Sequence, residues 1–98
     1  MTFPADPAEQ LSTEKALLVK ADCDIEQGRA RLRNQQLLLS ELQAAGYDSS
    51  QAERLVKLLQ QTLVEWERHR ALIAGRVNYL ERQFYPENLG QGRRGASS

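Results

Sequence analysis

Apolar residues recur at every seventh position along two long stretches of this chain. The first series is Leu11, Leu18, Ile25, Leu32 and Leu39, and the second is Ala52, Leu59, Trp66, Ile73 and Leu80. A seven-residue apolar repeat is typical of a helix that packs one seam against another helix. Because only a short turn separates the two series, the helices must lie antiparallel. The sequence therefore predicts an all-α fold, a long antiparallel two-helix hairpin of the coiled-coil type.

Local signals place the turn between the two helices. Gly46 favours the left-handed conformation in which a helix commonly ends. Asp48-Ser-Ser-Gln51 has the pattern of a capping box at the start of the next helix, and Tyr47 and Ala52 are spaced for a hydrophobic staple. The second helix is expected to end at Tyr85-Pro86, because proline disfavours helical geometry in the residue before it.

These signals divide the chain into three parts. We predict an N-terminal arm at 1–12, a helical hairpin at 13–85 and a disordered, Gly- and Ser-rich tail at 86–98. Within the hairpin, the helices are expected at about 13–45 and 49–84, with the turn at 46–48. The arm offers an alternative: Asp6 followed by Pro7 is a good helix start, so the arm forms a short helical turn or the first helix begins near residue 7.

A glycine inside the first helix requires an explanation. Glycine destabilises a helix interior by about 1 kcal/mol relative to alanine. Folding the chain about Tyr47 pairs residues whose numbers add up to about 94, which places Gly28 opposite Trp66. We predict that Gly28 makes room for the indole.

Composition narrows the class of protein. The 98 residues include 13 basic and 13 acidic side chains, so the formal net charge is zero, and general nucleic-acid binding is not expected. A single cysteine excludes an internal disulfide and suits a reducing cytosol. No secretory signal is evident, and no apolar run exceeds four residues, so no membrane span is expected. We predict a cytoplasmic protein.

The chain carries no recognisable catalytic pattern. It has no Ser/His/Asp grouping, Gly-rich phosphate loop or Cys-x-x-Cys pair, so we expect no enzyme, no cofactor, no metal and no small-molecule substrate. His69 is the one residue with a chemical alternative, because Cys23 and its neighbouring aspartates come from the facing stretch and could complete a metal or pH-responsive site. One Cys and one His match no zinc pattern, so the favoured interpretation is a packed histidine bonded to Glu65 or Asp24.

The two ends of the hairpin hold more apolar residues than one seam can bury. The candidates for contacts with other chains are Leu37, Leu38, Leu42, Leu55, Val56, Leu58, Leu59, Leu63, Trp66, Val77 and Phe84. A second hairpin laid against the first would cover such residues in a four-helix bundle. We therefore expect a homodimer and a non-catalytic interaction module that also binds another protein, as an adaptor, inhibitor or regulator.

The middle of the predicted hairpin is rich in arginine, which supports a different function. Its members are Arg29, Arg31, Arg33, Arg68, Arg70 and Arg76. The alternative hypothesis is a nucleic-acid-associated regulator that uses these side chains. Glu26, Glu65 and Glu67 stand at helical spacings from them, however, and favour a solvated, salt-bridged face.

Several short motifs resemble a group of small bacterial proteins that have no assigned activity. The motifs are Ala21-Asp22, Asp24-Ile25, Gly28, Leu42, Gly46-Tyr47-Asp48, Leu58-Leu59 with Leu63, and His69-Arg70 with Ile73. The resemblance covers roughly residues 18–75. It implies a helical hairpin in a bacterial cytoplasm and supplies no substrate, cofactor or partner.

Overall fold

The chain forms two long helices joined by a short turn. The computed structural model describes residues 6–84, in which α1 spans Pro7–Ala45 and α2 spans Ser50–Phe84 and no strand occurs. This confirms the predicted all-α helical hairpin. The predicted tail at 86–98 and the first five residues lie outside the described part of the chain.

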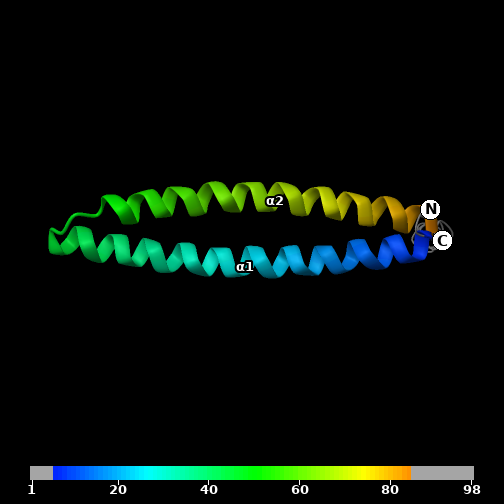
Figure 1. Cartoon of the computed structure of the whole chain (residues 1–98), viewed down its shortest axis with the longest axis horizontal. Helices are drawn as coiled ribbons and strands as arrows, with labels where there is room; N and C mark the ends of the chain where they lie inside the picture. Colours follow the sequence, from blue (N-terminus) through cyan, green and yellow to red (C-terminus); the bar gives the residue numbers. More distant parts are fainter. Residues whose placement is uncertain (1–5, 85–98) are drawn as a thin grey trace, which may run out of the picture. The chain divides into compact units, whose positions relative to one another are not determined.

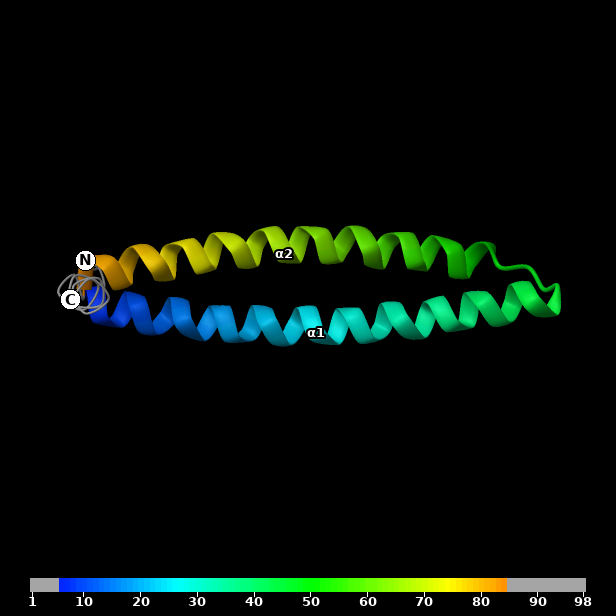
Figure 2. The ribbon, with the colours of Figure 1, turned by 180° about the vertical axis from the view of Figure 1, so that it is seen from behind.

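The described residues belong to two compact units. The turn unit comprises residues 20–70, and the terminal unit comprises residues 6–19 and 71–84. In each unit a stretch of α1 lies beside a stretch of α2 that runs in the opposite direction (Figures 1 and 2). Neither helix has an apolar stretch of the length and hydropathy that a membrane span needs.

The start of α1 is capped by Asp6. The Asp6 carboxylate accepts a hydrogen bond from the Ala8 amide at 2.8 Å, and the Asp6 carbonyl accepts one from the Gln10 amide at 2.9 Å. Pro7 takes the first helical position, where its missing amide proton is not needed. The helix therefore uses the earlier of its two possible starts, and the expected boundary near residue 13 is corrected to residue 7.

Gly46 ends α1 as predicted. It has φ +75°, the left-handed conformation that glycine adopts without strain. The Gly46 amide donates to the Gln43 carbonyl at 3.2 Å, and the Tyr47 amide donates to the Leu42 carbonyl at 3.0 Å. This pair of bonds is a Schellman motif, which satisfies carbonyls that the helix end leaves without partners.

The start of α2 differs from the predicted capping box by one residue. The Ser49 carbonyl accepts the first helical bond, from the Glu53 amide at 2.9 Å, so Ser49 is the cap. The Asp48 carboxylate accepts bonds from the Ser50 amide at 3.0 Å and from the Ser50 hydroxyl at 2.6 Å. Tyr47 is 70% exposed, so the expected staple does not bury its ring. Asp48 thus satisfies the helix start from outside the helix.

These bonds make the stability of the turn depend on pH. Hydrogen bonds from the Ser50 hydroxyl and then the Ser50 amide lower the pKa of Asp48 below its ordinary value of 3.8. Because the pKa of Asp48 is lower in the folded state than in the unfolded state, ionised Asp48 stabilises the fold at pH values above the unfolded-state pKa. This stabilisation is lost as the pH falls through the folded-state pKa. We expect the melting temperature of the wild type to exceed that of Asp48→Asn at pH 6 and the difference to shrink towards pH 3. A difference that stays constant over this range would contradict the assignment.

The seam between the helices has two rows on each helix, alternating by three and four residues. One row on each helix is the row predicted from the sequence, and the other is a second row beside it. On α1 the second row is Glu14, Ala21, Gly28, Gln35 and Leu42. On α2 it is Val56, Leu63, Arg70, Val77 and Phe84. The buried core of the turn unit contains Ile25, Ala52, Val56 and Leu63, and that of the terminal unit contains Leu11, Ile73 and Val77. The three-four spacing is that of a coiled coil.

Candidate protein-interaction surface

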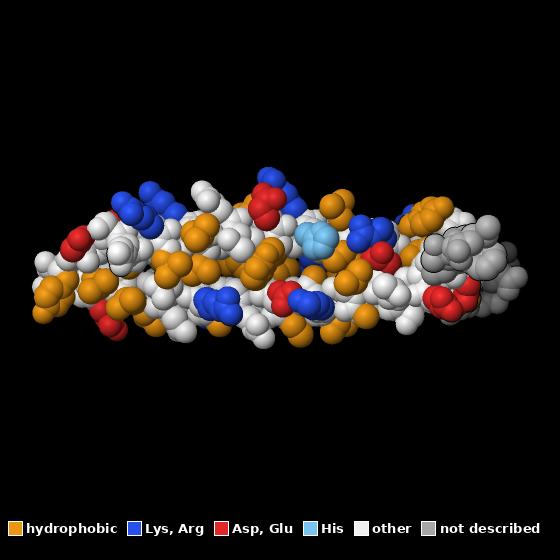
Figure 3. All heavy atoms as spheres, in the orientation of Figure 1, with side chains coloured by type: hydrophobic (Ala, Val, Ile, Leu, Met, Phe, Trp, Pro, Cys, Tyr) orange, Lys and Arg blue, Asp and Glu red, His pale blue; other side chains and the backbone are white. Residues whose placement is uncertain are grey.

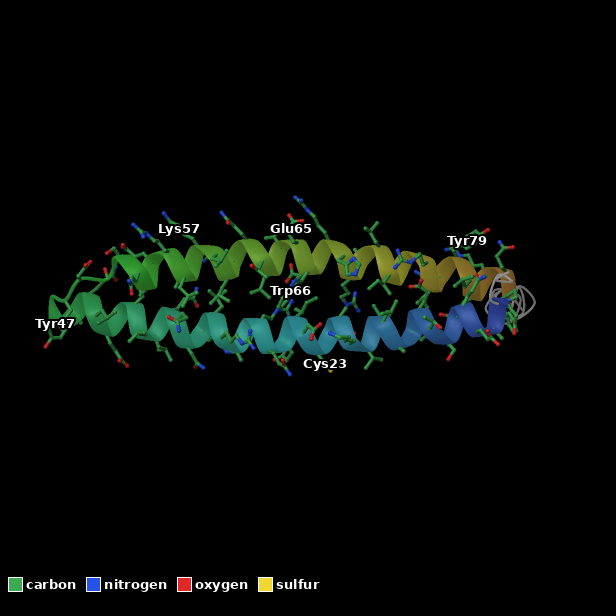
Figure 4. The ribbon with its side chains drawn as sticks, viewed as in Figure 1. Cys23, Tyr47, Lys57, Glu65, Trp66 and Tyr79 are labelled. Atoms are coloured by element: carbon green, nitrogen blue, oxygen red, sulfur yellow. The ribbon has the colours of Figure 1, made fainter. Side chains whose placement is uncertain are left out.

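The two helices of the turn unit pack closely at Gly28. A Cβ atom at this position would stand 2.9 Å from Leu63 Cδ2 and 3.1 Å from Trp66 Cζ3. Figure 4 shows the Trp66 side chain directed into the space between α1 and α2. The predicted pairing of Gly28 with Trp66 is therefore confirmed. The indole is not fully enclosed, since 37% of Trp66 remains exposed.

One edge of the turn unit is polar and held by ion pairs between the helices. Arg29 donates to the Glu67 carboxylate at 3.0 Å, and Arg70 donates through Nε to the Asp22 carboxylate. The hydrogen bond to Asp22, with its negative charge, raises the pKa of Arg70. Together with Ile25 and Glu26 these side chains line a shallow hollow of about 520 Å³. We call Asp22, Arg29, Glu67 and Arg70 the polar edge.

The opposite edge of the turn unit exposes leucines. Leu38 of α1 is 42% exposed, and Leu55 and Leu58 of α2 are 39% and 57% exposed. Leu38 and Leu55 directly precede seam residues, whereas Arg29 and Glu67 directly follow them, so the two pairs flank opposite sides of the seam. In the view of Figure 3, apolar side chains follow the line between the helices in this unit. We call Leu38, Leu55 and Leu58 the leucine edge.

The other predicted interaction residues are distributed differently. Leu42 and Leu59 are half-buried in the seam beside the leucine edge, and Leu37 is exposed on α1 outside both seam rows. Val56, Leu63 and Val77 are buried between the helices of their own units and form no part of an exposed surface. Phe84 is partly exposed in the terminal unit. The sequence therefore predicted the leucine edge together with residues that the hairpin buries itself.

The structure corrects the interpretation of His69. His69 is exposed, and its neighbour Arg70 takes the seam position. The two predicted partners of the imidazole bind other side chains: Glu65 pairs with Arg68 at 3.1 Å and Asp24 pairs with Lys20 at 2.8 Å. Cys23 is also exposed and points away from α2 (Figure 4). Within residues 6–84, no three His, Cys, Asp or Glu side chains are arranged to hold a metal ion.

The arginine-rich middle is largely paired with acids. Arg29, Arg68 and Arg70 form the ion pairs described above, and Arg76 pairs with Glu14 at 3.1 Å. Glu65 neutralises Arg68 at helical spacing as predicted, whereas Glu67 neutralises Arg29 on the facing helix and Glu26 forms no ion pair in the described residues. Arg31 and Arg33 have no ion pair within residues 6–84. Four of the six arginines in this group are thus neutralised by carboxylates.

The terminal unit contains a polar seam residue that sequence reasoning missed. Glu14 is mostly buried; its Oε1 atom pairs with Arg76, and its Oε2 atom is buried with no hydrogen-bond partner among the described residues. A groove of about 380 Å³ runs past it, lined also by Gln10, Thr13, Tyr79 and Leu80. The signal that could have found Glu14 is its position three residues after Leu11, on the second row of the seam.

Comparison with known proteins adds no family to this picture. No protein family matches the chain, and neither the curated proteins nor the solved structures contain a significant match to it.

Proposed function

We propose that this chain is a non-catalytic protein-interaction module that pairs with a second copy in a four-helix bundle and regulates or connects another protein. The observation that carries the proposal is the contrast between the two edges of the turn unit. One edge is polar and its charges are paired across the helices, whereas the other exposes three large leucines. Grouped exposed leucines favour contact with another apolar surface. A bacterial, cytoplasmic setting is part of the same proposal.

The leucine edge makes a direct test possible. We expect the double substitution Leu38→Glu with Leu55→Glu to abolish self-association, because each glutamate would have to be desolvated without a partner in the interface. The matched control adds the same two charges to exposed positions beside the polar edge, Gln36→Glu with Gln60→Glu, and is expected to associate like the wild type. Light scattering measures the mass, and circular dichroism checks that each variant remains helical.

The same pair of variants tests binding to another protein. We expect proteins that co-purify with the tagged wild-type chain to be retained by the control variant and lost by the Leu38/Leu55 variant. Equal capture by both variants would place the binding surface elsewhere. Loss of association in both variants would show a general effect of added charge and would contradict the role of the leucine edge.

The alternative, a nucleic-acid-associated regulator, has weaker physical support. Four of the six arginines in the middle of the chain are paired with carboxylates. A phosphate-binding surface needs a field of unpaired basic side chains, and its affinity falls steeply with salt. A salt-dependent gel shift that disappears in the Arg31→Glu, Arg33→Glu double variant would favour this alternative over the proposal.

A further inference from the structure

We propose that the second copy lies side by side with the first on the leucine edge, with both turns at the same end. In this arrangement α1 of each copy packs antiparallel against α2 of the other. The inference rests on the proposed self-association and specifies its geometry. It is carried by the charges that accompany the leucines along this edge of the turn unit.

The register of the turn unit determines which residues would meet. Three contacts join the helices at matching levels: Arg29 with Glu67, Asp22 with Arg70, and Gly28 with Trp66. The residue numbers in these pairs add up to between 92 and 96. A two-fold axis parallel to the helices keeps equivalent residues at the same level, so the same sum relates α1 of one copy to α2 of the other.

On α1, Asp24, Arg31 and Leu38 lie along this edge, each seven residues from the next. A sum of 94, the middle of this range, places Asp24 level with residue 70 of the second copy. His69 is the residue before it, so Asp24 and His69 of the second copy lie at nearly the same level. Arg31 comes within two residues of the level of Glu65 of the second copy. Leu38 comes level with Leu55 and Leu58 of the second copy.

Each of these three contacts between the copies would be favourable. An imidazole N–H can donate to a carboxylate, a guanidinium pairs with a carboxylate, and leucine packs on leucine. The two-fold axis repeats every contact, so the interface would contain two of each. His69 and Arg31, which form no ion pair within the described residues, would both gain acidic partners.

The side chains involved are accessible in a single chain. Arg31, Glu65 and His69 are exposed. The existing pairs of Glu65 with Arg68 and of Asp24 with Lys20 link neighbouring turns of one helix, and all four side chains are substantially exposed. A carboxylate has two oxygens that accept several hydrogen bonds, so these pairs leave room for a partner from the second copy.

Charge reversal tests the geometry. Arg31→Glu would bring two glutamates together wherever position 31 of one copy meets position 65 of the other. Glu65→Arg would bring two arginines together at the same place. We expect each single variant to raise the dimer dissociation constant at least about tenfold, because like charges juxtaposed in an interface are strongly unfavourable. The double variant Arg31→Glu with Glu65→Arg restores opposite charges and is expected to return to within about threefold of the wild type. Sedimentation equilibrium measures all three constants.

The control is Arg33→Glu, which changes the charge by the same amount two residues away from Arg31, on another face of α1. We expect it to leave the dissociation constant unchanged. If the single reversals have no effect while Leu38→Glu with Leu55→Glu still abolishes the dimer, the side-by-side geometry is wrong and the proposed function stands. Failure of the double variant to recover also overturns the geometry. A wild type that is monomeric throughout overturns the second copy as occupant and, with it, the proposed four-helix bundle, and the co-purification experiment then decides the proposed binding of another protein.

Discussion

Replacing Gly28 with leucine is expected to destabilise the hairpin by about 1–3 kcal/mol, in spite of the better helix propensity of leucine. The Cβ atom alone would lie 2.9 Å from Leu63 Cδ2 and 3.1 Å from Trp66 Cζ3, and the remaining three carbons of leucine would add further volume at this contact. The larger residue must therefore push α2 away or displace the indole. Thermal unfolding followed by circular dichroism measures the loss, and Trp66 fluorescence reports a displaced ring.

The control for this prediction is Ala30→Leu. Ala30 lies two residues further along α1 and outside both seam rows. The same side chain added there is expected to change stability by less than about 0.5 kcal/mol. Both variants must be compared at the same protein concentration, because association makes the melting temperature depend on concentration. Equal losses in the two variants would contradict the close packing at Gly28.

Replacing Ile73 with alanine is expected to destabilise the protein by about 2–5 kcal/mol. Ile73 is 1% exposed and is the largest fully buried side chain in the described residues. A thin two-helix core has few other side chains that can relax into the space it would leave. Because small domains are stable by only about 5–15 kcal/mol, this single change should lower the melting temperature markedly.

Leu72→Ala provides the comparison for Ile73. Leu72 is the preceding residue, but it is 64% exposed. We expect its truncation to have a small fraction of the effect, because little of its surface is removed from water by the hairpin. A larger loss of stability in Leu72→Ala than in Ile73→Ala would show that the seam does not run where the structure places it.

Much of the fold was predictable because helix pairs are encoded locally. The seven-residue apolar rows, the left-handed Gly46 and the facing of Gly28 and Trp66 all follow from spacing along the chain. The second row of the seam was harder to find because several of its members are polar. Glu14 and Arg70 place aliphatic stems in the seam while their charged ends reach ion-pair partners on the facing helix.

The candidate surface was only partly predictable. A step of one residue turns a helix by about 100°, so adjacent apolar residues face different directions. Leu55 and Val56 look alike in the sequence, yet Val56 is buried in the seam and Leu55 is on the leucine edge. The same step separates the exposed His69 from Arg70 in the seam. Assigning each residue to seam or edge requires the second row of the seam, which apolar spacing alone does not give because members such as Arg70 are polar.

In the proposed function, another chain covers the leucine edge, and the first candidate is a second copy of this protein. The most direct test is the mass of the wild-type protein by light scattering, over a dilution series from high to low micromolar concentration. We predict a particle of twice the 11.1 kDa chain mass at the concentrated end, which dissociates to the monomer on dilution, whereas Leu38→Glu with Leu55→Glu is expected to be monomeric throughout. A mass of 11.1 kDa at every concentration would contradict self-association through this edge.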